Sequence, residues 1–121
     1  MMVAVRGAIQ VSANDAEAIR SAGLRLLRSV LDGNGVAPED IVSIIFSLTP
    51  DLTRANPATA TREGGFAEVP LFCVQEAVVE GQPGRIIRLL MTYRGDRDRK
   101  PVPVFLDGAQ VLRPDLSPGR P

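Results

Sequence analysis

The first residues of the chain alternate between apolar residues and polar or small ones. The odd positions from 3 to 11 read Val, Val, Gly, Ile and Val, and Arg6 stands among the even positions. A period of two predicts a β-strand with one face toward a core. Arg6 is then expected to project from the opposite face of that strand.

A helical period follows over about residues 15–32. Asn14, three residues before Glu17, has the spacing of a capping box. A Gly-Asn-Gly run at 33–35 is typical of a helix end. We expect one long amphipathic helix there, with these apolar residues on its inner side: Ile19, Leu24, Leu26, Leu27, Val30 and Leu31.

Short apolar segments separated by helix and turn signals occupy the rest of the chain. Asn56 as an N-cap and Pro57 at the first helical position predict a short helix that ends at Gly64 and Gly65. Five strands and two helices indicate an α+β fold. The last residues, about 117–121, are expected to form a frayed tail. Four segments are predicted to be strands beside the first one: residues 41–49, 69–74, 85–93 and 102–106.

Length and composition narrow the range of functions. The 121 residues fit a single domain, 1–121. The 14 basic residues balance the 14 acidic ones, which argues against bulk binding to nucleic acid or to an anionic membrane. The sequence has no His and one Cys, which excludes histidine bases, Ser-His-Asp triads, an internal disulfide and multi-cysteine zinc sites. The first residues lack a long apolar run, so we expect no signal peptide and a cytoplasmic location.

Arg88 interrupts the otherwise apolar run Ile-Ile-Arg-Leu-Leu-Met. A cation in such a strand is costly unless an anion pairs with it, and that anion is either an acidic side chain or a ligand; an edge position that reaches water is the other explanation. Arg6 has the small neighbours Gly7 and Ala8, which leave room for a ligand or for another backbone. Glu76 follows the third predicted strand and is a candidate partner for either arginine.

Together these residues predict one kind of pocket. Two or more arginines with one glutamate would hold a small polyanion by bidentate hydrogen bonds. Cys73 is more typical of a small buried hydrophobe than of a nucleophile, because no His can activate it. Reactions that need only binding and electrostatic stabilisation suit such a pocket.

Four stretches of the sequence resemble a known family, the monofunctional chorismate mutases of the trimeric pseudo-α/β-barrel type. They are VRGAIQV, SLTPDLTRANPATATRE, VPLFCVQE, and RIIRLLMTY with the downstream VFLDGAQVLRPDLS, and the spacing agrees over about residues 3–117. The resemblance implies a mixed five-stranded sheet with two helices and a homotrimer with active sites between subunits. It implies the rearrangement of chorismate to prephenate in Phe and Tyr biosynthesis, with no cofactor, metal or covalent intermediate.

The resemblance also implies roles for individual residues. Arg88 matches the arginine that donates to the ether oxygen of the breaking bond and to a carboxylate, and Arg6 matches an arginine that binds the side-chain carboxylate. Glu76 matches the glutamate that meets the ring hydroxyl. These three residues are therefore expected to be catalytic. Further expected substrate-binding positions are Ala58, Thr59, Arg62 near the cleft mouth, Phe72, Cys73, Phe105, and Leu112 with Arg113 in a closing C-terminal segment.

At four positions the chain departs from the family's pattern. Phe105 replaces a tyrosine, Thr59 a lysine, Asn56 an aromatic residue and Phe72 a threonine. These changes spare the residues expected to be catalytic, so we expect weaker substrate capture with the chemistry intact. Three other hypotheses stay open: a degenerate trimer that binds or converts a chorismate-like dianion in secondary metabolism, a trimeric enzyme of the imine-deaminating type, and a structural protein in which the buried arginine only pairs with an acid.

Overall fold

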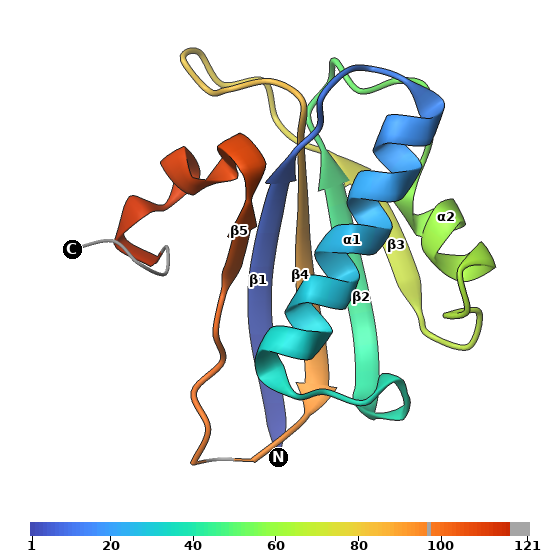
Figure 1. Ribbon diagram of the computed structural model, residues 1–121, viewed down its shortest axis with the longest axis vertical. Helices are drawn as coiled ribbons and strands as arrows, with labels where there is room; N and C mark the ends of the chain where they lie inside the picture. The colour runs from blue at the N-terminus through green and yellow to red at the C-terminus, as the bar shows by residue number, and fades with distance from the viewer. Residues whose placement is uncertain (97, 117–121) are drawn as a thin grey trace.

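Five strands form one mixed sheet in the part of the chain that this computed structural model describes, residues 1–96 and 98–116 (Figure 1). β4 is central and pairs antiparallel with β1 and β2, whereas β5 pairs parallel with β1 and β3 parallel with β2. The tail expected at 117–121 lies outside the described residues. The strands, in the sheet order β3-β2-β4-β1-β5, are Leu71–Gln75, Ile41–Leu48, Ile86–Arg94, Met2–Gln10 and Val104–Leu106.

Both described α-helices, α1 Ala16–Asn34 and α2 Pro57–Glu63, lie against one face of the sheet (Figure 1). Neither is long and apolar enough to span a membrane. The predicted helices and strands are confirmed, but the last strand is shorter than expected. Pro103 has no N–H, and the backbone N–H of Val102 donates to Oδ1 of Asn34 at 2.7 Å, so neither residue joins the ladder. Short 3-10 helices complete the fold: Pro38–Asp40, η2 Asp107–Leu112 and Pro114–Leu116.

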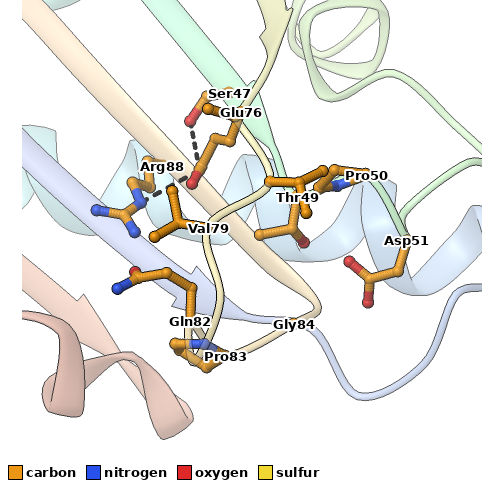
Figure 2. Close-up of a pocket in the computed structure, with 12 residues that line it drawn as sticks. Ser47, Thr49, Pro50, Asp51, Glu76, Val79, Gln82, Pro83, Gly84 and Arg88 are labelled. Carbon is orange, nitrogen blue, oxygen red and sulfur yellow. Dashed lines mark hydrogen bonds and ion pairs between the residues drawn. The ribbon is translucent and has the colours of Figure 1, made fainter.

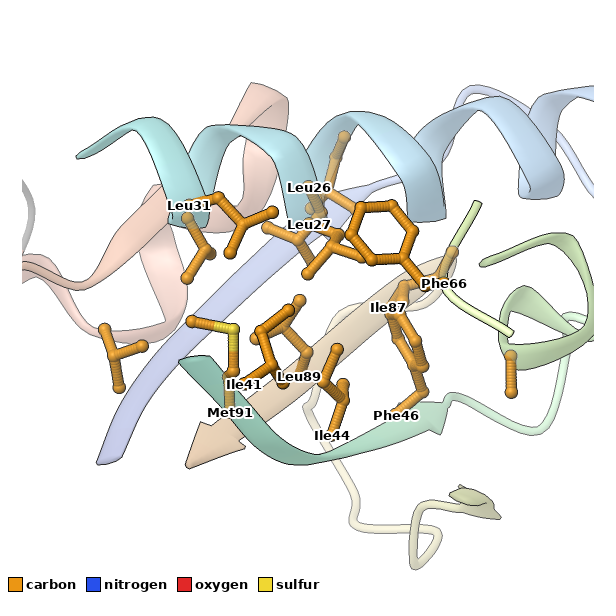
Figure 3. Packing of buried hydrophobic residues seen from close by; sticks show 14 of the residues in the cluster. Leu26, Leu27, Leu31, Ile41, Ile44, Phe46, Phe66, Ile87, Leu89 and Met91 are labelled. Atoms are coloured by element: carbon orange, nitrogen blue, oxygen red, sulfur yellow. The ribbon is translucent and has the colours of Figure 1, made fainter. Parts of the chain in front are cut away.

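The hydrophobic core fills the space between α1 and the sheet (Figure 3). Alternate side chains of a strand point to opposite faces, so Ile87, Leu89 and Met91 of β4 enter the core together. The inner side predicted for α1 is also confirmed, although Leu24 is only half-buried. Because these side chains occupy the core face of β4, Arg88 projects from the opposite face.

The capping-box prediction for Asn14 is wrong. Asp15 caps α1 instead, because its carboxylate accepts the backbone N–H of Ala18 at 3.0 Å. The Asn14 side chain is held by the loop after β2: it accepts the backbone N–H groups of Thr53 and Arg54 and donates to the Thr53 hydroxyl. Asn14 thus makes tertiary hydrogen bonds in place of the helix cap that its local spacing predicted.

The sheet face away from α1 and α2 carries exposed apolar side chains. Ile45 of β2 and Leu90 of β4 are 42% and 46% exposed there, and the paired edge strand β3 adds Phe72 and Val74. We call this the open face. An apolar patch of this kind is typical of a surface that another protein chain covers.

Candidate active site

Three arginines line a hollow of about 380 Å³ on the open face. They are Arg6 of β1, Arg88 of β4, and Arg113, which follows η2. Arg113 also donates two hydrogen bonds to Asp115, which raises the pKa of its guanidinium. Three cations around one hollow favour an anionic ligand, because arginine binds carboxylates through paired N–H groups. The other lining residues are Gly7, Ala8, Ile45, Ser47, Leu89, Leu90 and Phe105.

Strand pairing explains why Arg6 and Arg88 meet. In the antiparallel β1–β4 ladder Ala8 lies opposite Arg88, and Arg6 lies two residues further along the same face. The expectation that Arg6 leaves the core is confirmed, since the residue is exposed. Gly7 faces α1, where an added Cβ would come within 3.0 Å of Val30, so its small size serves helix packing.

Arg88 pairs with Glu76, which is one of the two pairings that the sequence left open. Nε of Arg88 lies 3.2 Å from Oε2 of Glu76, and the two side chains are 39% and 18% exposed. The contact is an ion pair without hydrogen-bond geometry, because Nε, although buried, has no hydrogen-bond partner. Since β4 is central in the sheet, the edge explanation for Arg88 is wrong.

Arg88 lines a second hollow as well, and Glu76 lines only that second one. The second hollow, of about 580 Å³, is walled by the end of β2 and by the connection between β3 and β4 (Figure 2). Both terminal nitrogens of Arg88 point away from the Glu76 carboxylate in Figure 2. They are therefore in a position to bind an anion while Nε stays beside Glu76.

A small apolar cluster holds the C-terminal segment against the sheet. Phe105 of β5 is buried against Ala8, Ile86 and Ala109, and Leu112 packs on this cluster. η2 thereby docks onto β1, and the residue that follows it, Arg113, reaches the hollow. The sequence-predicted residues Phe105, Leu112 and Arg113 thus lie on the same side of the molecule as Arg88.

The remaining expected site residues lie away from these hollows in the structure. None of them lines either of the two hollows beside Arg88. Ala58 of α2 is buried in the core, whereas Thr59 and Arg62 of the same helix are exposed. Phe72 of β3 is 74% exposed, and Cys73 points to the other face of that strand. One chain therefore brings together only part of the expected site.

Cys73 packs against the core and lines a third hollow, of about 220 Å³, with Asn56. Burial raises the pKa of the Cys73 thiol, because the thiolate loses solvation there. The thiol is therefore protonated at neutral pH and is a poor nucleophile. This agrees with the expectation of a small hydrophobe. Within the described ranges, no group of three or more Cys, Asp and Glu side chains is arranged to hold a metal ion.

Three polar residues near the site were missed by the sequence analysis. Ser47 donates to Oε2 of Glu76 at 2.7 Å. Thr49 accepts the backbone N–H of Ile86 at 3.0 Å, and Asp51 accepts that of Arg85 at 2.9 Å, so both residues fix the start of β4. For Ser47 the available signal was a polar residue on one face of an apolar strand, which alone does not name a partner; Thr49 and Asp51 lie beyond the end of β2.

Comparison with known proteins identifies the family. The family model for chorismate mutase type I matches residues 2–116. The chain belongs to the type I chorismate mutases. It is similar to chorismate mutase AroH of Thermus thermophilus, with 41% identity over 118 residues that cover 96% of this chain and 97% of that protein. It is also similar to chorismate mutase AroH of Bacillus subtilis, with 39% identity over 119 residues, 97% of this chain and 94% of that protein.

A solved chorismate mutase from Clostridium thermocellum has the same fold. The TM-score is 0.87 at 40% sequence identity, and the match covers 91% of this chain and 99% of that one. The resemblance of the four sequence stretches to the chorismate mutases, and the fold that it implied, are thus confirmed. None of these comparisons favours the binding-only, imine-deaminating or purely structural hypothesis.

Proposed function

We propose that this type I chorismate mutase converts chorismate to prephenate, in aromatic amino-acid biosynthesis, at sites that each combine residues of two neighbouring subunits of a homotrimer. The observation that carries the proposal is Arg88, which pairs with Glu76 and lines a hollow on the open sheet face together with Arg6 and Arg113. A dianionic substrate matches the charge of that hollow.

The reaction breaks a C–O bond and forms a C–C bond within one molecule. Negative charge grows on the ether oxygen as the C–O bond stretches, while no proton has to be transferred. A guanidinium held beside that oxygen stabilises the transition state more than the ground state. Arg88 is in a position to do this, because its terminal nitrogens point away from Glu76 (Figure 2).

The neighbouring residues supply binding and orientation. Arg6 and Arg113 line the same hollow as Arg88 and can each pair with a substrate carboxylate. Glu76 carries a carboxylate that can accept a hydrogen bond from the ring hydroxyl. Holding both ends of the substrate in this way favours the compact conformation in which the reacting carbons meet.

Two observations support a site between subunits. The resemblance assigns Thr59 and Arg62 to the site, but both project from α2 and neither lines the hollow, so a second copy would have to bring them to Arg88. The exposed apolar residues of the open face, among them Phe72 and Leu90, give that copy a surface to bury. A cyclic trimer would build three equivalent sites, with Cys73, Phe72 and Ala58 on the second side of each.

Conversion of chorismate, followed by proton NMR with purified protein, tests this function. We expect prephenate from the wild type and at least a ~10²-fold lower kcat for Arg88→Ala, because the donor to the developing charge is lost. Arg94→Ala, at the exposed end of the same strand, should keep wild-type turnover and serves as the matched control. Wild-type turnover by a folded Arg88→Ala protein would refute the role of Arg88, and no prephenate from wild type would refute the function.

A further inference from the structure

Ser47 is a polar residue in the largely apolar strand β2. The β2–β4 register places it directly opposite Arg88, so its side chain emerges on the open face beside the guanidinium. It is half-buried and, like Arg88, lines both of the hollows described above. A residue at this junction can influence both members of the pair.

The Ser47 hydroxyl fixes one particular oxygen of Glu76. It donates to Oε2 at 2.7 Å, and the same oxygen lies 3.2 Å from Nε of Arg88 (Figure 2). Among the described residues, this is the only hydrogen bond that the Glu76 side chain makes. The backbone N–H of Glu76 separately donates to the carbonyl of Leu48 at 2.8 Å, so the hydroxyl acts on the side chain and not on the course of the main chain.

A different orientation of the Glu76 carboxylate would compete with a ligand for Arg88. A carboxylate beside an arginine prefers a two-point pairing with the guanidinium fork. Without the serine, Glu76 is free to turn and to close on the terminal nitrogens of Arg88. Those nitrogens are the donors that an anionic substrate needs. Ser47 is short and is carried by a strand, so it can hold the longer glutamate side chain in one orientation.

We propose that Ser47 is a positioning residue for the reaction: its hydroxyl orients the Glu76 carboxylate so that Oε1 accepts the substrate hydroxyl while the terminal nitrogens of Arg88 stay open to the substrate. This inference rests on the proposed function of the Arg88–Glu76 pair.

Steady-state kinetics with chorismate provide the first test. We expect Ser47→Ala to lower kcat/KM roughly ten- to hundredfold, with a higher KM because Glu76 then competes with the substrate for Arg88, and a lower kcat because the misplaced groups also act in the transition state. Ser47→Thr keeps the hydroxyl and should recover activity to within about threefold of wild type. Ser43→Ala, on the same strand and opposite Thr92, should have no effect.

A double-mutant cycle separates positioning from a general loss of packing. In a Glu76→Ala background, Ser47→Ala should cost less than about twofold more, because its partner is already gone. Wild-type kcat/KM for Ser47→Ala would overturn the proposal. So would a loss that persists in full when Glu76 is absent.

Crystal structures of wild type and Ser47→Ala give a readout that does not depend on turnover. The Glu76 carboxylate should move onto the terminal nitrogens of Arg88 in the variant. If wild type makes no prephenate but Glu76 still moves, the proposed function fails and the positioning role stands. A Glu76 side chain that keeps its place without Ser47 would overturn the role whatever the activity.

Discussion

The Arg88 guanidinium is half-buried, with one carboxylate beside it and an open hollow on its other side. Electrostatic attraction to a ligand grows as solvent is excluded, so a substrate that fills the hollow strengthens its own contact with Arg88. The single ion pair with Glu76 lowers the cost of placing a cation in the sheet while leaving donors for a ligand. These properties suit a reaction whose transition state gains negative charge.

The reactivity of the Cys73 thiol can be predicted from its burial. Burial raises the pKa of its thiol above the ordinary value of 9.0, so the reactive thiolate is scarce at neutral pH. Alkylation by iodoacetamide should therefore be slow near pH 7, and its rate should rise with pH and go on rising beyond pH 9, and Cys73→Ser should keep kcat within about tenfold of wild type. Rapid labelling at neutral pH would show that the thiol is activated, and abolished turnover in the folded Cys73→Ser protein would assign it a part in the chemistry.

Single residues differ in how far sequence alone could assign them. That Arg88 would pair with an anion was one of the alternatives the sequence offered, because a cation inside an apolar strand is costly, but the choice between Arg88 and Arg6 as the partner of Glu76 was left open. Ser47 could not be assigned, since a serine in a strand is equally compatible with solvent exposure. Its importance depends on the register of β2 against β4 and on where the chain returns after β3. The assignment of Asn14 as a helix cap also failed because of a contact between distant parts of the chain: its side chain binds Thr53, which is 39 residues away in the sequence.

At the level of elements, the end of β2 is tied to the start of β4. Thr49 and Asp51 accept the backbone N–H groups of Ile86 and Arg85, two and three residues before Arg88. The order and type of the helices and strands followed from apolar periodicity, because α1 and the strands each bury one regular face. The length of β5 did not, since it depends on the buried side chain of Asn34.

The Asp51 contact makes stability depend on pH. The Thr49 hydroxyl, chiefly, and the backbone and charge of Arg85 lower the pKa of the Asp51 carboxyl from 3.8, so the ionised form stabilises the folded state. That contribution is complete above the ordinary value and is lost as the pH falls through the lowered one. Asp51→Asn should therefore reduce the free energy of unfolding near pH 7 by no more than about 1 kcal/mol, because Asp51 is exposed and solvent screens it.

Urea unfolding of wild type and Asp51→Asn at several pH values checks this. The difference between the two proteins should shrink as the pH falls below the ordinary carboxyl value and should vanish near about pH 2. A difference that stays constant from neutral to acidic pH would instead assign the effect to the shape of the side chain.

At the level of the whole molecule, the residues of the proposed site fall into two separate groups on one chain. Arg6, Glu76 and Arg88 lie on one side, and Thr59 and Arg62 project from α2 on the other. The need for a covering subunit was already suggested by the apolar residues on both faces of the fourth strand, and the exposed Leu90 agrees with it. Periodicity could not predict which residues a subunit would contribute to its neighbour's site, because that contribution depends on how the subunits assemble.

Activity of mixed trimers tests the shared site most directly. One chain carries Arg88→Ala and the other carries Thr59→Glu together with Arg62→Glu, which places repulsive charge against a dianion; each is first shown to be inactive on its own. Trimers that contain both chains are isolated through two different affinity tags. In a cyclic trimer every such mixture has one site built from the two intact halves, so we predict about one third of wild-type kcat per trimer. Mixed trimers that form normally but convert no chorismate would contradict a site shared between subunits.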